Sequence, residues 1–416
     1  MKNRRFWFFP IFLFWIIAFL PNTLRPQMIL GQYEDEAPFR TWNTFGIPSA
    51  PSLAMGETQF TLAYDCLVSL SNPALLTTLP KITFTLNSSI DTASFYRYSI
   101  VNTGPLQIDG KSSLSLLAFN FAGASVRVKN WTFALSIALT ENYFRPHPDG
   151  DFYYRGYLYY SLDLDQEGIL KNINFSIARK VFRGLSVGLG LNYTWGNLQK
   201  NIEERWSTSN ITITDNKSHT FQGFYLNGGL LLDLTEDIII ALIFRTPYVK
   251  KSESEGLLRF NSPNGDTDIK IEASGNSEYK QPFVAGLGVS YKFSSKLRVA
   301  SDFTFYNWSK YSITYFDDED EIKRNFKDIF KIGLGFEYIS PIRIFGIKAG
   351  IPLRAGLSYD PQPMEVPNSS YFYFSFGTGL QWGKFLLDAG MLIGKEKGSG
   401  NSLSAQKVAL SMSFRL

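Results

Sequence analysis

The chain has 416 residues and a net charge of +4, and 44% of its residues are hydrophobic and 16% aromatic. The small net charge and the lack of a basic tract give no sign of nucleic-acid binding, and we expect none. The single cysteine, Cys66, excludes an internal disulfide, and the two histidines, His147 and His219, are too far apart in the sequence to predict a His/Cys metal site.

The N-terminus predicts a secretory signal peptide at residues 1–32. Three basic residues precede a short apolar run from Phe6 to Leu20, which is the order of the n-region and h-region of such signals. We place the cleavage site between Thr23 and Gln32. The alternative is a membrane-anchoring helix, which is disfavoured because the run is shorter than the ~20 residues that span a bilayer.

Residues 33–80 lack the alternation of the chain that follows them. The part from Gly46 to Pro80 is rich in small residues, and it also carries apolar residues such as Leu53 and Phe60. Such residues would be unusual in a free tail. We therefore expect this segment to fold as a plug into the lumen of the barrel predicted below, with a loose periplasmic tail as the alternative.

Residues 81–416 alternate with a period of two in segments of about ten residues, as expected for membrane-spanning strands with two unlike faces. In the last segment, Leu410 and Met412 alternate with Ala409, Ser411 and Ser413. A soluble β-sandwich also alternates. However, the second face here is rich in Gly, Ser and Ala, which suits a crowded lumen better than a solvated surface.

The pattern predicts fourteen strands, an even number as in bacterial barrels. They lie near residues 81–90, 112–128, 131–144, 169–180, 185–197, 218–234, 237–249, 282–293, 297–313, 327–339, 346–359, 371–382, 385–394 and 406–416. Tight turns such as Lys129-Asn130 alternate with longer connections such as 145–168, 198–217 and 250–281, and this asymmetry is typical of periplasmic turns and outer loops. The sequence thus predicts an all-β, transmembrane antiparallel β-barrel in the lipid of the bacterial outer membrane.

The predicted strands also assign side chains to the membrane. Met412 is expected to face lipid and Ser411 the lumen, so arginine should destabilise the barrel at Met412 and matter much less at Ser411. Ser252 and Asp318 are expected to lie in outer loops. Aromatic residues near strand ends are assigned to interfacial girdles, and these are Trp131, Tyr193, Trp195, Trp308, Tyr311, Tyr338, Tyr371 and Trp382.

Charged residues fall on the lumen side of several predicted strands. The candidates are Arg298, Asp302, Lys331 and Arg354, with Glu337 and Asp388 on the same faces. Arginine or lysine on the lipid face would cost ~2–4 kcal/mol near mid-membrane. An inward cation can hold a carboxylate head group, but a structural ion pair between neighbouring strands is the favoured alternative.

The sequence contains no arrangement of residues that predicts catalysis. Its two distant histidines do not suggest a Ser/His/Asp triad, so we expect no enzymatic activity, no cofactor and no bound metal. The acidic run from Asp317 to Glu321 offers oxygen ligands for a divalent cation, yet a solvated loop face is the favoured interpretation.

Several motifs resemble the long-chain fatty acid transporter family of outer-membrane proteins, which includes aromatic-hydrocarbon uptake channels. The N-terminal hatch pattern of that family is matched by Ala54, Met55, Gly56, Ala63, Asp65, Asn72, Pro73 and Ala74. Later motifs follow in the same order, and they are Phe244-Arg245-Thr246-Pro247, Asp302 through Asn307-Trp308-Ser309, and Arg354 through Asp360. The chain departs from the hatch pattern at Glu57 and Cys66, where a small residue and a second acid are common.

This resemblance implies a barrel with residues 33–80 as a hatch in its lumen. It also implies passive uptake of hydrophobic small molecules, such as long-chain fatty acids or aromatic hydrocarbons. We expect the protein to be a monomer. The aromatic segment 152–160 would suit a landing site for such a substrate. The alternative function is a barrel that serves as a scaffold or shuttle component of a protein secretion system. A general porin is disfavoured because a plug would block bulk flow.

Overall fold

The computed structural model describes residues 45–94, 106–109, 113–143, 150–154, 157–207, 210–262, 268–317, 321–323, 326–363, 368–398 and 404–416. The predicted signal peptide, residues 1–32, lies outside these ranges, and so do residues 33–44 of the predicted hatch segment. None of the helices in the described ranges is long and apolar enough to cross a membrane.

The first described segment, residues 45–80, folds into short helical turns, and we call it the hatch. Its elements are α2 (Ala50–Ala54), α3 (Val68–Ser71) and the 3-10 helix η2 (Pro73–Thr78). Ser49 and Asn72 cap α2 and η2, since their side-chain oxygens accept the backbone N–H groups of Ser52 and Ala74. Proline in the first turn of both helices suits these starts, because the N–H it lacks has no helical partner there.

The remaining elements form one antiparallel sheet, apart from a second 3-10 helix, η3 (Trp308–Lys310). The strands are β1 (Ile82–Ser94), β2 (Leu106–Asp109), β3 (Ser113–Val128), β4 (Trp131–Asn142), β5 (Gly150–Tyr154), β6 (Tyr157–Phe182), β7 (Leu185–Trp206), β8 (Ile211–Asp233), β9 (Ile238–Arg245), β10 (Tyr248–Asn261), β11 (Asp268–Gln281), β12 (Val284–Lys292), β13 (Leu297–Tyr306), β14 (Ser312–Thr314), β15 (Ile322–Lys323), β16 (Ile329–Ile344), β17 (Ile347–Pro361), β18 (Ser370–Trp382), β19 (Phe385–Lys397) and β20 (Ser404–Arg415).

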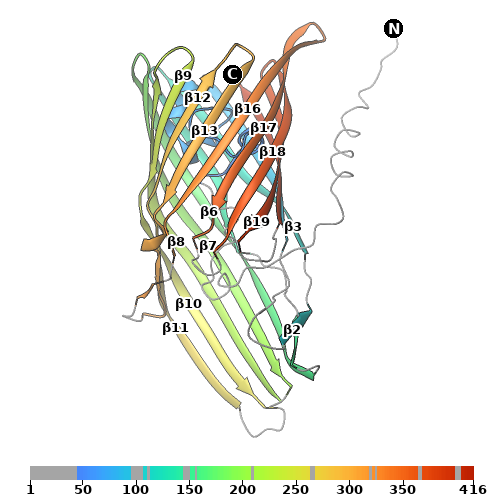
Figure 1. Cartoon of the computed structure of the whole chain (residues 1–416). Helices are drawn as coiled ribbons and strands as arrows, with labels where there is room; N and C mark the ends of the chain where they lie inside the picture. The colour runs from blue at the N-terminus through green and yellow to red at the C-terminus, as the bar shows by residue number, and fades with distance from the viewer. Residues whose placement is uncertain are drawn as a thin grey trace, which may run out of the picture.

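The sheet closes into a barrel, because β1 pairs with both β3 and β20 (Figure 1). Its wall has fourteen strands. β9 and β10 are consecutive parts of one wall strand, since both pair with β8. β12 and β11 continue one another in the same way, as do β13 and β14. The predicted fourteen-stranded barrel is therefore confirmed.

The motif around Thr246-Pro247 marks a break in the wall strand that β9 and β10 form. Ala241 and Ile243 point inward before the break, and Lys250 and Ser252 point inward after it, so the inward parity changes from odd to even. Proline cannot donate to the ladder and is tolerated at such irregular positions. Simple alternation therefore fails beyond this point, and the prediction of one uninterrupted strand over 237–249 is wrong.

The strands β6, β7, β8, β10 and β11 continue well beyond the part of the barrel that contains the hatch. Figure 1 shows them as a long sheet at the lower end. β6, β7 and β8 contain 26, 22 and 23 residues, whereas ~9–11 tilted residues span a bilayer. The connections predicted as loops over 145–168, 198–217 and 250–281 are thus largely strand. The sequence signal is weak there because neither face of the sheet touches lipid, and polar residues then occupy the outer face.

We call this part of the sheet the outer extension. It consists of residues 157–168, 198–206, 211–219, 252–261 and 268–277.

The extension changes the choice of sites for a topology experiment. Ser252 is buried on the inward face of β10 rather than lying in an outer loop, and Asp318 lies outside the described residues. In a Cys66→Ser background, we expect Lys270→Cys to react with a membrane-impermeant maleimide on intact cells. Asn130→Cys, in the tight turn between β3 and β4, should remain unlabelled. Labelling of Asn130→Cys alone would invert the orientation.

The last strand shows the two faces of the wall. Met412 is 46% exposed and faces lipid, whereas Ser411 is 6% exposed and faces the lumen. A contact with the hatch changes what we expect of arginine at Ser411. Ser411 Oγ accepts the N–H of Ala50 in the hatch at 2.9 Å, so a long cation there would displace the hatch.

Met412→Arg is expected to destabilise the barrel, because it puts a cation on the lipid face. The expected loss is ~2–4 kcal/mol if the site lies near mid-membrane, and urea unfolding in lipid vesicles measures it. Met412→Leu is the matched control and should cost less than ~1.5 kcal/mol. Equal losses for the two variants would contradict a lipid-facing position.

Three residues assigned to the interfacial girdles instead lie inside the barrel. Trp308, Tyr311 and Tyr371 are almost fully buried, and Trp308 and Tyr311 pack with Phe326. The strand predicted over 297–313 ends at Tyr306, after which η3 turns these aromatic side chains inward. An aromatic residue near a strand end therefore does not by itself indicate the membrane interface.

Candidate functional site

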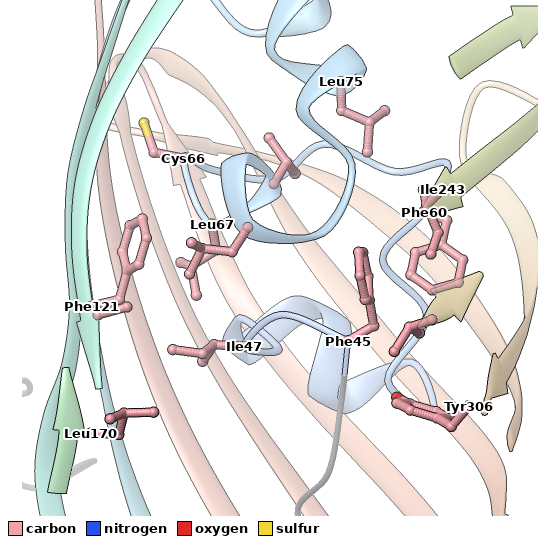
Figure 2. Close-up of a cluster of buried hydrophobic side chains, with 14 of the residues drawn as sticks. Phe45, Ile47, Phe60, Cys66, Leu67, Leu75, Phe121, Leu170, Ile243 and Tyr306 are labelled. Carbon is pink, nitrogen blue, oxygen red and sulfur yellow. The ribbon is translucent and has the colours of Figure 1, made fainter. Parts of the chain in front are cut away.

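The apolar core lies inside the barrel, between the hatch and the inner face of the wall. Figure 2 shows Phe45, Phe60 and Leu67 of the hatch close to Phe121 and Ile243 of the wall. The rings of Phe45 and Phe60 meet edge to face at 6.0 Å. Residues 45–80 are nearly all buried, so the hatch fills this part of the lumen.

The motif Ala54-Met55-Gly56 is a point of close approach between hatch and wall. Gly56 has a φ of +66°, a left-handed conformation that glycine adopts without a steric penalty. A Cβ on wall residue Gly356 would overlap the backbone of Met55 and Gly56. The Gly56 N–H donates to Ser375 Oγ at 2.8 Å. Glycines on the inner wall thus make room for the hatch backbone.

The second part of the hatch motif is a turn fixed by Asn72. Its side-chain oxygen accepts the N–H of Ala74 at 3.1 Å, and its amide nitrogen donates to Phe60 C=O at 2.7 Å. Pro73 starts η2, and a Cβ on Gly229 of the wall would overlap the Asn72 side chain. Asn72 therefore ties two parts of the hatch together where both touch the wall.

Asp65 and Cys66 lie in the loop before α3. The carboxylate of Asp65 accepts the N–H of Leu67 at 2.9 Å, and the N–H of Cys66 donates to Thr85 Oγ1 of β1 at 3.0 Å. The Cys66 Sγ lies 3.6 Å from Ser125 Oγ of β3. This loop is thus held against the first two wall strands by neutral polar contacts.

Two of the four predicted lumen charges bind the hatch directly. Asp302 Oδ2 accepts the backbone N–H groups of Gln59 at 2.6 Å and Phe60 at 3.0 Å. Lys331 Nζ lies 2.6 Å from a carboxylate oxygen of Glu57. Glu57 is a position at which the chain departs from the transporter family pattern, and here it carries an ion pair between hatch and wall.

The other two predicted charges form a network within the wall. Arg354 bridges Glu337 at 2.6 Å and Asp388 at 2.7 Å, and Arg298 pairs with the second oxygen of Glu337. The ring of Tyr64, in the hatch, lies 5.0 Å from the Arg354 guanidinium and 5.5 Å from that of Arg298. Tyr64 therefore receives two cation–π contacts.

A further buried cation, Lys250, lies on the outer side of the hatch. Its Nζ is 2.9 Å from a carboxylate oxygen of Glu141 and donates to the hydroxyl of Tyr143. The ring centroids of Tyr143, Phe221 and Tyr279 lie 4.8 to 5.5 Å from Nζ. Lys250 is not among the lumen charges predicted from the sequence. The parity change near Pro247 hides its inward direction, and the predicted strand ends at residue 249, so Lys250 falls in a predicted loop.

An apolar groove of about 520 Å³ lies on the lipid-facing side of β1, β3, β4 and β20. Its floor includes Gly123 together with Thr85 and Ser136. Thr85 and Ser136 also contact the hatch on the other side of the wall. Thr85 Oγ1 accepts the N–H of Cys66, and the hydroxyl oxygens of Ser136 and Ser69 are 3.2 Å apart. Only the wall separates this groove from the hatch.

The acidic run in the outer loops is only partly described. Asp317 bonds to Asn276, and Glu321 pairs with Lys280 at 2.9 Å. Hydrogen bonds from Ser312 and, next in size, from Lys280 lower the pKa of Glu321. Within the described ranges, no group of His, Cys, Asp and Glu side chains is arranged to hold a metal ion.

The predicted landing segment is also only partly visible. Its backbone forms β5 and the start of β6, joined across Arg155 and Gly156, which lie outside the described residues. Tyr157 is exposed at the start of β6.

Comparison with solved structures identifies the architecture. The toluene transporter TodX of Pseudomonas putida has a TM-score of 0.66 at 16% identity, over 89% of this chain and 98% of that chain. The toluene transporter TbuX of Ralstonia pickettii has a TM-score of 0.59 at 16% identity, over 90% and 100%. A FadL homologue of Pseudomonas aeruginosa has a TM-score of 0.65 at 13% identity, over 89% and 99%. The predicted resemblance is confirmed for the fold.

Comparison with curated proteins found no match. The model of the BamG family matches residues 151–406, a region from β5 to β20 that includes the lumen charges and Lys250. Since this region is more than half of the 416 residues, the chain belongs to the BamG family, and its fold is that of an outer-membrane transporter barrel.

Proposed function

We propose that this protein is a passive outer-membrane channel for hydrophobic small molecules. The observation that carries the proposal is the hatch, which fills the lumen and is held to the wall by non-covalent contacts such as Lys331–Glu57, apart from its chain connection to β1. A filled lumen excludes bulk flow of solutes, and a hatch that is joined covalently to the wall only where it leads into β1 can move within the barrel. Transport then requires a substrate that displaces or bypasses the hatch.

The inner surface offers such a substrate an apolar route. In the outer extension, Phe260 and Ile271 lie on the same strand faces as inward residues of the lumen. Further in, the rings of Phe221 and Tyr279 meet edge to face beside Lys250. A hydrophobic molecule therefore finds apolar contacts both in the extension and next to the hatch.

The charges of the lumen favour an uncharged substrate. The four lumen cations described above each have a carboxylate partner, in the pairs Lys250–Glu141, Lys331–Glu57, Arg298–Glu337 and Arg354–Asp388. A fatty acid carboxylate would have to break one of these pairs, and breaking a buried pair is costly. We therefore favour an aromatic hydrocarbon over a long-chain fatty acid. The groove beside Gly123 then provides an apolar surface next to the hatch for release into the bilayer.

A reversible lock of the hatch tests the proposal. Ser125→Cys places a second thiol beside Cys66, because the side-chain atoms of the two residues are 3.6 Å apart. In cells that express this variant, we expect oxidation to stop toluene uptake and a reducing agent to restore it. The same substitution in a Cys66→Ser background is the matched control and should transport under both conditions.

Uptake by the same cells also distinguishes the two substrate classes. We expect toluene to enter faster than oleate, and the reverse order would overturn the preference for an uncharged substrate. If the unmodified protein accelerates the uptake of neither compound, or if the locked variant transports as well as the control, the channel function fails. A role as a scaffold or shuttle in secretion would then be the better hypothesis.

A further inference from the structure

The outer extension has two unlike edges. On one side, the edge of β6 is covered by β5, and β5 is covered in turn by β2. On the other side, β11 pairs with β10 along its whole length, but its second edge pairs with β14 only over Glu278–Lys280. In the part of the chain that the structure describes, no strand covers residues 268–274 on this second edge (Figure 1).

The direction of the backbone groups on β11 follows from Asn276. Its C=O accepts the N–H of Asp317 at 2.7 Å, and its N–H donates to the Asp317 carboxylate at 3.0 Å. Both groups therefore point away from β10. Because the backbone of an antiparallel strand alternates with a period of two, the N–H and C=O groups of Ser274, Glu272 and Lys270 point the same way. They form a row at the free edge.

The side chains of this edge strand are sorted by face. Ile269 and Ile271 are on the inward face and are each 52% exposed, next to Phe260 and Leu258 of β10. On the outward face, Lys270 pairs with Glu272 of the same strand. An added strand would therefore meet apolar side chains on one face and charges of both signs on the other.

We propose that residues 268–274 of β11 bind an extended strand of another cell-surface polypeptide, which adds to the sheet by β-augmentation. Main-chain hydrogen bonds supply affinity in this recognition mode, and alternate side chains supply specificity. The partner strand would carry apolar residues beside Ile269 and Ile271. On its other face it would carry an acid opposite Lys270 and a base opposite Glu272.

A second copy of this chain is a poor occupant of the edge. Two copies of β11 that pair antiparallel in one sheet are related by a two-fold axis normal to that sheet, which would turn the second barrel upside down in the membrane. In a parallel pairing, the two copies would be related by a two-fold axis along the strands, so the second sheet would present its opposite face. The apolar row of Ile269 and Ile271 in one copy would then lie beside the charged row of the other copy. A different polypeptide has neither restriction.

The charges on β11 also limit which strands can add. Charged side chains on an edge strand commonly discourage non-specific pairing. Here Lys270 and Glu272 have opposite signs, so they oppose a strand of uniform charge and accept one whose charges alternate in the complementary order.

A synthetic peptide tests the proposal on the full-length protein in detergent. The peptide has valine at alternate positions and, between the valines, a glutamate and a lysine placed to face Lys270 and Glu272. We expect it to slow amide hydrogen exchange at Lys270, Glu272 and Ser274. The amides of Ile269 and Ile271 point toward β10 and should be unaffected. Equal protection of both sets, or no binding to the unmodified protein, would overturn the proposal.

A proline variant and its control separate the backbone from the side chain. Glu272→Pro removes a free-edge N–H, and proline is tolerated where that group faces solvent, so we expect peptide affinity to fall by about tenfold. Glu272→Ala keeps the N–H and should change the affinity by no more than about threefold. Equal binding to the proline and alanine variants would contradict β-augmentation.

A modified peptide gives a test that does not depend on the folding of the proline variant. A peptide N-methylated on the edge that faces β11 cannot donate hydrogen bonds, and we expect it not to bind the unmodified protein. Binding equal to that of the parent peptide would overturn the proposal. Toluene uptake does not enter any of these measurements, so failure here leaves the channel function untouched.

Discussion

Deletion of residues 46–80 is expected to convert the closed barrel into a water-filled channel. The wall begins at Ile82 and closes through the pairing of β1 with β20, so its inter-strand hydrogen bonds do not depend on the hatch. The hatch fills the lumen with buried residues, and without it the polar inner wall becomes hydrated. Conductance across planar bilayers should rise by an order of magnitude or more, while selective uptake of toluene should fall.

A milder variant serves as the control for this deletion. Pro73→Ala leaves the hatch in place but removes the fixed φ at the start of η2, so conductance should rise only slightly. The Asn72 side chain still holds the turn through Ala74 and Phe60. If the deletion variant conducts no better than the intact protein, the hatch is not what closes the lumen, and hatch-gated transport is wrong.

Arg354→Met is expected to cause the largest loss of stability of any single substitution in the lumen network. The Arg354 guanidinium is fully buried between the carboxylates of Glu337 and Asp388. Its removal leaves Asp388 as a buried charge whose ion pair is lost. Breaking a buried pair in this way costs about 3–5 kcal/mol, and urea unfolding in lipid vesicles measures the difference from the unmodified protein.

A second variant tests whether the lost partner is the cause. Arg354→Met combined with Asp388→Asn removes the uncompensated charge, while Glu337 keeps its contact with Arg298. We expect this double variant to be more stable than Arg354→Met alone. Arg259→Met, which breaks an exposed ion pair with Asp268, should leave the free energy of unfolding almost unchanged, because solvent screens such pairs. A double variant no more stable than the single would show that packing, not charge, explains the loss.

The barrel itself was predictable from the sequence. Lipid on one side and a packed lumen on the other impose opposite demands on successive residues, so the two-residue period of segments such as the last strand identifies them as wall. The tight turn at Lys129-Asn130 and its equivalents set the direction of the chain. The same logic put Arg298, Asp302, Lys331 and Arg354 on the lumen side, where the structure also has them.

The outer extension was not predictable in this way. Beyond the bilayer no lipid selects apolar residues on the outer face, so strands such as β11 carry Lys270 and Glu272 there and read as loops. The parity change at Thr246-Pro247 had the same effect on Lys250. Alternation of apolar residues identifies the side chains that touch lipid. It does not identify strands that lie outside the membrane or strands whose inward parity changes.

The sequence by itself determined which side chains of a membrane-spanning strand face lipid and which face the lumen. Each strand carries this information alone, because its two faces meet different surroundings. Only the tertiary structure decided the partners across the lumen. Glu57 meets Lys331 and Tyr64 meets Arg354 over separations of hundreds of residues, and such contacts depend on how a closed wall positions all its strands around the hatch. The free edge of β11 has the same origin, since whether a strand is covered depends on which other segments reach it.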